Sequence, residues 1–150
     1  MNAIELLKAD HRTVRKLLDE LADTSVRATK ARPELLAQIE RELSAHTRIE
    51  EEIFYPAFRK AGGGEEATMY HEAREEHRAV EKLVLPDLKE TDPASHEFSG
   101  RAKVLKELVE HHADEEEEEM FADAEKLLSA DRLAALGAQM EARKRELLQG

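Results

Sequence analysis

Four histidines and two glutamates recur in the sequence at matching intervals, and both residue types bind metal ions. The interval is 35 residues in each of two pairs, from His11 to His46 and from His77 to His112. A glutamate follows the second histidine of each pair by four positions. On a helix such a spacing puts the imidazole and the carboxylate on one face, where both can bind the same group. The six candidate ligands are His11, His46, Glu50, His77, His112 and Glu116.

The matching intervals belong to an internal repeat with an offset of 66 residues. Residues 11–18 lie over residues 77–84 with five of eight positions identical, and the same offset places His46 over His112 and Glu50 over Glu116. We interpret this as a duplication of a helix pair, whose two halves are related by an approximate twofold axis.

The elements that must position these residues are helices. The chain is rich in Ala, Leu, Glu, Lys and Arg and poor in β-branched and aromatic residues, which favours helix over strand. Apolar spacing and turn residues predict four long helices, with Pro86 ending or kinking the third, and a shorter amphipathic fifth one. We expect an all-α fold, an antiparallel up-down-up-down four-helix bundle with a short additional C-terminal helix. One domain spans 1–150, with the bundle at about 3–128 and the C-terminal helix at about 130–148.

The histidines and glutamates occupy positions where a helix buries leucine. The stripe predicted for the second helix is Leu36, Ile39, Leu43, His46, Glu50, Ile53 and Ala57, and that of the fourth includes Leu105, Val109, Met120 and Leu127. Carboxylates and imidazoles in a bundle interior are costly unless compensated. Either they form a hydrogen-bonded polar network, or they bind cations, and two histidines per half with two carboxylates able to bridge suit two metal ions. Mixed imidazole and carboxylate ligands suit iron, manganese or zinc and exclude an all-oxygen calcium site.

Four motifs occur in order along the chain: His11, His46-Thr47-Arg48-Ile49-Glu50, His77 and His112-Ala113-Asp114-Glu115-Glu116. The stretch Glu51-Glu52-Ile53-Phe54-Tyr55-Pro56 follows the first His-x-x-x-Glu motif. This ordered set resembles the hemerythrin-like family, also called the HHE cation-binding domain. The resemblance covers about residues 5–125. It implies a four-helix bundle with a non-haem di-iron centre, its two iron ions joined by carboxylates and an oxo or hydroxo bridge. The four histidines would then be terminal ligands, and Glu50 and Glu116 would bridge.

The sequence departs from the oxygen-carrying hemerythrins in one respect. In those proteins the third helix supplies an extra histidine four residues away, but here Ala73 and Glu81 occupy the positions four residues from His77. Reversible oxygen carriage is therefore in doubt, and both metals would be open to oxygen, nitric oxide or peroxide. Tyr70 and His71 are candidates for a role beside the metals or as an extra ligand, although Tyr70 also suits ordinary core packing.

Charge and composition exclude several other classes of function. The net charge of −11 argues against nucleic acid and acidic membranes as partners. The absence of cysteine removes disulfides and thiolate metal sites, and no apolar run or signal peptide is evident, so we expect a cytoplasmic protein. We also expect a monomer or weak dimer. Two functions stay open, a di-iron protein that binds or senses oxygen, nitric oxide, peroxide or iron status, and a di-iron enzyme with peroxide-decomposing, nitric oxide-reducing or ferroxidase activity.

Three further features have simpler interpretations. We expect the acidic run 114–119 to form a solvated helix face from which only Glu116 points inward. His111 should point sideways and His96 should lie at the surface. The glycines at 62–64 lack the flanking residues of a phosphate loop and predict a turn.

Overall fold

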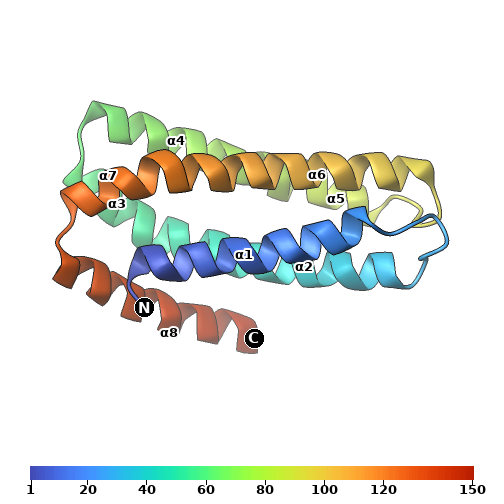
Figure 1. Ribbon diagram of the computed structural model, residues 1–150, viewed down its shortest axis with the longest axis horizontal. Helices are drawn as coiled ribbons and strands as arrows, with labels where there is room; N and C mark the ends of the chain where they lie inside the picture. The colour runs from blue at the N-terminus through green and yellow to red at the C-terminus, as the bar shows by residue number, and fades with distance from the viewer.

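Five helical segments make up the computed structural model, which describes residues 1–150 and contains no strand (Figure 1). The first segment is α1 (Ala3–Ala22), and the last is α8 (Ala130–Gln149). Each of the three segments between them holds two α-helices joined by a π-helical turn. They are α2 (Ala31–Ile49), η1 (Glu50–Phe54) and α3 (Tyr55–Ala61); α4 (Gly64–Ala79), η2 (Val80–Val84) and α5 (Leu85–Lys89); and α6 (His96–Glu115), η3 (Glu116–Met120) and α7 (Phe121–Leu127). The expected all-helical fold with a further C-terminal helix is confirmed.

The first four segments lie along the long axis of the molecule, and α8 lies along one side of them next to the N-terminus (Figure 1). Side-chain caps fix where several helices begin. Asn2 accepts a hydrogen bond from the Glu5 amide while the Glu5 carboxylate accepts one from the Asn2 amide, and Ser95 and Ser129 cap α6 and α8. Such caps satisfy amides that have no partner within the helix.

A layer of polar residues divides the apolar core into two parts. One part includes Leu7 of α1 and Phe54 and Phe58 near α8, and the other includes Leu18 and Ile39 at the opposite end. Along each helix the buried histidines and glutamates fall between these two apolar groups. The fold therefore holds the candidate ligands in the middle of the molecule, with apolar side chains packed on both sides of them along the bundle.

The π-helical turns shift the buried face of each helix by one residue. The sequence predicts Ile53 and Ala57 on the core stripe, but both are only partly buried, whereas Phe54 and Phe58 are fully buried. The prediction is wrong because η1 begins at Glu50 and inserts one residue into the helical repeat, so every later core position comes one residue later.

The same shift follows Glu116 in the second half of the repeat. Leu127, predicted on the stripe, is 37% exposed, whereas Phe121 and Ala124 are buried. In the third segment Pro86 does not end the helix, because α5 continues to Lys89. The proline is the second residue after η2, where the amide of Leu85 bonds to the carbonyl of Val80, five residues back. Proline has no amide to give to the regular ladder, so the π-helical turn lets the helix continue through it.

A buried arginine joins the two loops at the end of the bundle opposite the α3–α4 turn. Arg32 is 1% exposed and donates hydrogen bonds to the side chain and carbonyl of Thr24, at 3.0 and 3.1 Å. It also reaches the carbonyls of Pro93 and Ser95, at 2.8 and 3.2 Å, and the hydroxyl of Ser99 at 2.7 Å. These bonds tie the α1–α2 loop to the α5–α6 loop.

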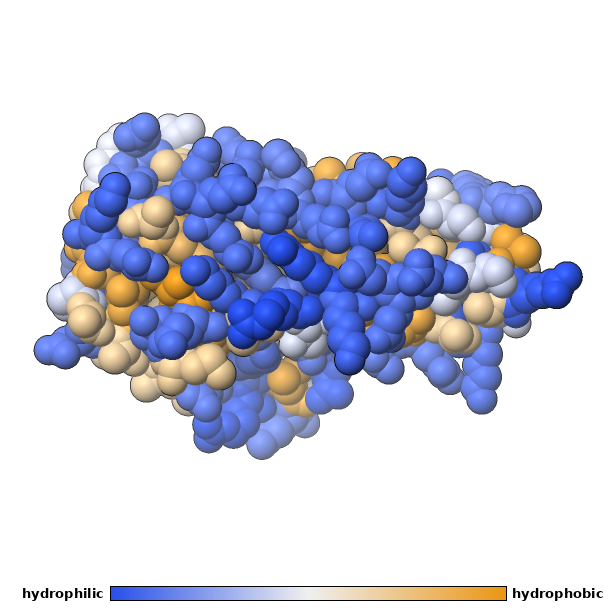
Figure 2. Space-filling view, viewed as in Figure 1, coloured by the Kyte–Doolittle hydropathy of each residue, from blue (hydrophilic) through white to orange (hydrophobic).

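The visible surface is dominated by hydrophilic side chains, with apolar residues between them (Figure 2). The large apolar side chains that are exposed include Leu83, Val104 and Leu108. No helix combines the length and the hydropathy that a membrane span needs.

Candidate metal centre

The structure brings all six candidate ligands into the polar layer. His11 comes from α1, His46 from α2, His77 from α4 and His112 from α6. Glu50 and Glu116 are the first residues of η1 and η3. All six side chains are buried, and Glu50 is 0% exposed. Four separate helical segments therefore converge on one interior point, and each half of the repeat contributes three of the six.

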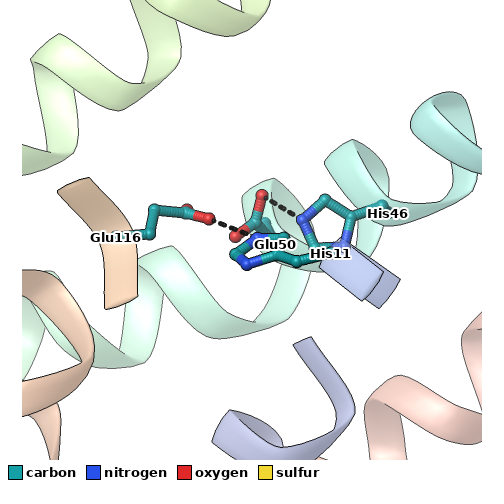
Figure 3. Close-up of side chains that lie close together, drawn as sticks. All are labelled: His11, His46, Glu50 and Glu116. Carbon is teal, nitrogen blue, oxygen red and sulfur yellow. Dashed lines mark hydrogen bonds and ion pairs between the residues drawn. The ribbon is translucent and has the colours of Figure 1, made fainter. Parts of the chain in front are cut away.

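The six residues form two overlapping groups of ligand atoms. The first is His11, His46, Glu50 and Glu116, drawn in Figure 3, and the second is Glu50, His77, His112 and Glu116. Within each group the ligand atoms lie within 4.8 Å of one another. The two carboxylates are shared, so the arrangement has two adjacent positions, each with two imidazoles of its own.

Each shared carboxylate contacts one imidazole from each half of the repeat. Glu50 Oε1 lies 3.1 Å from His46 Nε2 and 3.2 Å from His77 Nε2. Glu116 lies 3.0 Å from His11 Nε2 through Oε1 and 3.4 Å from His112 Nε2 through Oε2. Each glutamate thus spans the boundary between the two positions.

A second set of carboxylates accepts a hydrogen bond from the other ring nitrogen, Nδ1, of each of the four buried histidines. The Nδ1 atoms of His11 and His46 lie 2.8 Å from Glu117 and Asp10, respectively. Ionised carboxylates only accept hydrogen bonds, so Nδ1 carries a proton, and in the neutral ring Nε2 presents a lone pair to the interior. An outer carboxylate of this kind fixes the ring and is typical of metal-binding histidines.

The outer carboxylates obey the same 66-residue repeat. His77 Nδ1 lies 3.0 Å from Glu51, and His112 Nδ1 lies 2.6 Å from Glu76. Glu51 and Glu117 are 66 positions apart, and so are Asp10 and Glu76. The sequence interpretation overlooked all four, although the repeat offset was a signal that could have found them. It also assigned Glu117 to a solvated face, which is wrong because its carboxylate binds His11.

The inner atoms lack the partners that a metal-free polar network would give them. His46 Nε2 and both carboxylate oxygens of Glu50 are buried without a well-directed hydrogen bond, although His46 Nε2 lies 3.1 Å from Glu50 Oε1. His77 Nε2 and His112 Nε2 face each other at 3.1 Å, and two neutral rings with Nδ1 protonated would point lone pairs at one another. Cations between these atoms would use the lone pairs and offset the carboxylate charge, so the residues present fit metal ions.

The electrostatics of the inner groups show what competes with a metal. Burial opposes charging of the His46 ring, but Glu50 and Asp10 outweigh it and raise the pKa of His46 to about 10. Burial likewise opposes charging of His112, while Glu116 raises its pKa well above the usual range. For Glu116, burial acts against ionisation, but His112 and the other hydrogen-bond partners hold its pKa well below normal. Protons therefore occupy the imidazoles of His46 and His112 when no cation does.

A tyrosine makes the two halves different. The hydroxyl of Tyr55 donates to Glu116 and lies 3.3 Å from His77 Nε2. Burial and the nearby charges of Glu116 and Glu50 raise the pKa of Tyr55 well above its usual value. The residue at the repeat-related position is Phe121, whose ring stacks on His11 at 5.8 Å and offers no hydroxyl.

A small cavity adjoins the four imidazoles on the side away from Tyr55. Its volume is about 40 Å³, enough for a small number of waters or a diatomic molecule. The apolar part of its wall is formed by Val14, Leu43, Val80, Val109 and Ala113.

The sequence matches the family described as the Hemerythrin HHE cation binding domain over residues 2–124. The chain belongs to this family. A crystal structure of an HHE cation binding domain-containing protein from Mycobacterium kansasii is similar to this hemerythrin-like chain, with a TM-score of 0.86 and 29% identity. The similarity covers 99% of this chain and 88% of that one.

Two further relatives each match nearly all of the hemerythrin-like chain. An uncharacterized protein of Mycobacterium tuberculosis is 30% identical over 148 residues, covering 98% of this chain and 88% of that protein. A Nostoc protein described as a DNA nickase is 29% identical over 150 residues, which is 99% of this chain. The match is 41% of the Nostoc protein, so the chain spans less than half of that relative's length.

Two residues proposed from the sequence do not reach the inner groups of this hemerythrin-like centre. The ring of Tyr70 packs against Tyr55, with centroids 6.0 Å apart, and its hydroxyl accepts a hydrogen bond from Arg74 at 3.3 Å. His71 is exposed. The sequence cannot show that η1 turns Tyr55 inward, because a regular helix would place Tyr55 off the buried stripe. His111 is exposed beside Glu115, and His96 is exposed at the start of α6.

Proposed function

We propose that this hemerythrin-like chain holds two metal ions, one between His11 and His46 and the other between His77 and His112. Glu50 and Glu116 would bridge them. The observation that carries the proposal is the pair of ligand groups that share both carboxylates, with an outer carboxylate on every Nδ1 atom. A cofactor of two iron ions, oxo- or hydroxo-bridged, would supply redox chemistry and open positions for oxygen, nitric oxide or peroxide.

The donor set suits iron, manganese or zinc, and membership of the hemerythrin-like family favours iron among them. Four imidazole nitrogens and two carboxylates suit these first-row metals, and they do not form the all-oxygen shell that calcium prefers. The two-plus-two division of the histidines leaves both ions with positions that the protein does not fill.

The leading functional proposal is that the centre binds or senses a small molecule or the iron status of the cell. The cavity of about 40 Å³ beside the four imidazoles supports it, because a space of that size admits a diatomic molecule or peroxide and excludes larger metabolites. Its lining combines valine and leucine side chains with polar and charged ones, among them Arg15, Glu76 and Glu81.

Tyr55 supports a second candidate, a di-iron enzyme that decomposes peroxide, reduces nitric oxide or oxidises ferrous iron. A buried phenol hydroxyl beside Glu116 and His77 is positioned to hold a proton at the inner carboxylate. The repeat-related Phe121 offers no such hydroxyl, so only one side of the centre has it.

Metal analysis tests the proposal. We expect about two irons per chain after expression in iron-rich medium and anaerobic purification, with a near-ultraviolet absorption from the bridge once oxidised. His46→Ala should lower the metal content and the melting temperature of the loaded protein, since a metal that binds only the folded state stabilises it. His96→Ala is the matched control, because that imidazole is exposed and far from the centre in the fold. A folded protein that holds no iron, manganese or zinc would contradict the proposal.

Peroxide separates the two candidate functions. Sustained turnover of added peroxide by the loaded protein indicates an enzyme, whereas a stable adduct or a single loss of colour indicates binding. Nitric oxide is titrated under anaerobic conditions in the same way. Sustained consumption of nitric oxide indicates an enzyme, and a stable adduct indicates binding.

The remaining parts of the proposal concern the surroundings of the centre. Short connections between the segments and the chain direction visible in Figure 1 support the antiparallel up-down-up-down order of the four bundle segments. A cytoplasmic location and a monomeric or weakly dimeric state follow from the sequence and stay predictions.

A further inference from the structure

Helix α8 lies outside the bundle but is closely fitted to it. Its apolar face, which includes Leu133, Leu136 and Met140, joins the same core group as Leu7 of α1. At Gly137 the backbones touch, because a Cβ atom there would lie 2.4 Å from the carbonyl oxygen of Met1. Only glycine fits a contact of that kind. The position of α8 along the bundle is therefore set by packing, and so is the reach of its later side chains.

One of those side chains contacts the metal centre indirectly. The amine of Lys144 donates a hydrogen bond to Oδ1 of Asp10. The other carboxylate oxygen of Asp10, Oδ2, accepts from Nδ1 of His46 at 2.8 Å. A continuous chain of hydrogen bonds thus leads from the C-terminal helix to a proposed metal ligand.

Asp10 differs from the other three outer carboxylates in its burial. Its side chain is 5% exposed, whereas those of Glu51, Glu76 and Glu117 are 26–29% exposed. Water can solvate these three, but it reaches little of Asp10. A buried carboxylate needs a compensating charge or several hydrogen bonds, and the Lys144 amine supplies the charge.

The repeat-related carboxylate has no such cation. Glu76 occupies the position 66 residues after Asp10 and binds His112 in the same way, but no lysine or arginine lies within 4.0 Å of its carboxylate. Lys144 therefore acts on one half of the repeat, and the duplication provides an internal comparison within the same molecule.

We propose that Lys144 is a positioning residue through which the C-terminal helix sets the metal affinity of the position held by His11 and His46. The inference rests on the two-metal function proposed above. Lys144 holds Asp10 against His46, and Asp10 holds the His46 ring with Nε2 aimed at Glu50. Without the amine, the Asp10 carboxylate turns toward water and the ring loses its fixed orientation. Neither outer carboxylate of the position held by His77 and His112 contacts Lys144; those carboxylates are Glu51 and Glu76.

The test is anaerobic titration of the full chain with Fe²⁺ in competition with a chromophoric chelator, which resolves the two binding steps. We compare the wild type with Lys144→Met, which keeps the length of the side chain and removes the amine. We expect one of the two ions to bind up to about tenfold more weakly, the lower end of the range for losing an outer partner of a ligand, because Asp10 itself remains, and the other to bind as in the wild type. Lys144→Arg should restore most of the loss.

The matched control is Arg145→Met, a neighbouring loss of charge on an exposed side chain whose one ion pair is with Glu141 on its own helix. It should bind both ions as the wild type does. A second variant, Asp10→Asn, should weaken the same ion, and adding Lys144→Met to it should change that affinity by less than twofold, because the lysine acts through the aspartate.

The outcomes separate the positioning role from the alternatives. Wild-type affinity for both ions in Lys144→Met overturns the inference, and so does an equal weakening of both ions, which would mark a general loss of stability. An effect of Lys144→Met that persists undiminished in the Asp10→Asn background also overturns it. If Lys144→Met does not fold, Lys144→Gln is read by the same criteria. A wild-type chain that fails to bind two ions contradicts the proposed function itself, whatever the variants show.

Discussion

Protons compete with metal ions for the centre, and the competition predicts a steep dependence of metal affinity on pH. The carboxylates beside His46 raise the pKa of its imidazole to about 10. At pH 7 this ring is therefore charged in the metal-free protein, and a metal ion must displace its proton to use Nε2. Each proton displaced makes the apparent affinity rise about tenfold per pH unit, or about 1.4 kcal/mol, as long as the pH stays below the pKa.

The two positions should respond to pH with different steepness. Against the effect of burial, hydrogen bonds to Glu50 and Glu51 raise the pKa of His77, and the pKa of His112 is raised well above its usual range. From pH 7 to 8 we expect about a tenfold gain in affinity for the ion that displaces the His46 proton, and up to about a hundredfold for the ion that displaces both of the others.

Stability of the metal-free protein should change in the opposite direction. A raised pKa in the folded state stabilises the fold fully below the unfolded value of 6.5, and this contribution is lost as the pH rises toward about 10. The gain in melting temperature on adding metal should therefore grow across this window.

The assay is calorimetric titration with Mn²⁺ under anaerobic conditions, since Mn²⁺ neither oxidises there nor ionises its bound water near neutral pH. Repeating it in two buffers of different ionisation enthalpy counts the protons released, and we expect between one and three per chain at pH 7. His96→Ala should release the same number. An affinity that stays constant within a factor of two between pH 6.5 and 8.5, with no protons released, would refute the assignment of the inward nitrogens as ligands.

Three substitutions test other parts of the structure. Arg32→Ala should lower the free energy of unfolding of the metal-free protein by roughly 3 kcal/mol, measured by urea denaturation, because it leaves loop carbonyls buried without donors; an effect below about 0.5 kcal/mol would show that the loops do not need it. Tyr55→Phe should cost about 1.5–3 kcal/mol by the same measurement, since its hydroxyl donates to a buried carboxylate, whereas Tyr70→Phe should cost less than half as much; equal costs would contradict the special environment of Tyr55. Gly137→Val should lower the stability by about 1–3 kcal/mol and increase amide exchange in α8, and unchanged exchange would mean that the close backbone contact is not required.

The sequence was sufficient to predict the helical segments and the residues that meet in the interior. Heptad spacing locates a buried face, and a polar residue on that face has to point inward, so His46 and Glu50 could be paired without a structure. The internal repeat then gave the matching residues in the second half. These inferences depend on local periodicity, which single sequences carry well.

The sequence could not predict the π-helical turns or the change of buried face that follows them. The insertion at Glu50 changes which side chain faces inward from then on, so Tyr55 enters the centre and Ile53 leaves the core. Nothing in the composition of residues 50–54 distinguishes a π-helical turn from an α-helical one. Tyr70 was the natural choice of aromatic partner in its place, because it shares a regular helical stripe with His77.

The outer carboxylates were missed for a different reason. Glu117 belongs to an acidic run whose exposed appearance conceals one inward contact, and Asp10 adjoins His11 in sequence but binds His46 across the bundle. Such contacts depend on the rotation and separation of packed helices, which periodicity alone does not fix. Lys144 was beyond prediction because its reach depends on how α8 docks.

The central claim is that two metal ions lie side by side in the polar layer, sharing Glu50 and Glu116. A crystal of the iron-loaded protein, with data collected on both sides of the iron absorption edge, tests this most directly. The account predicts two anomalous peaks per chain, one beside the Nε2 atoms of His11 and His46 and one beside those of His77 and His112. A single peak, or iron at the exposed acidic side chains with none in the interior, would contradict it.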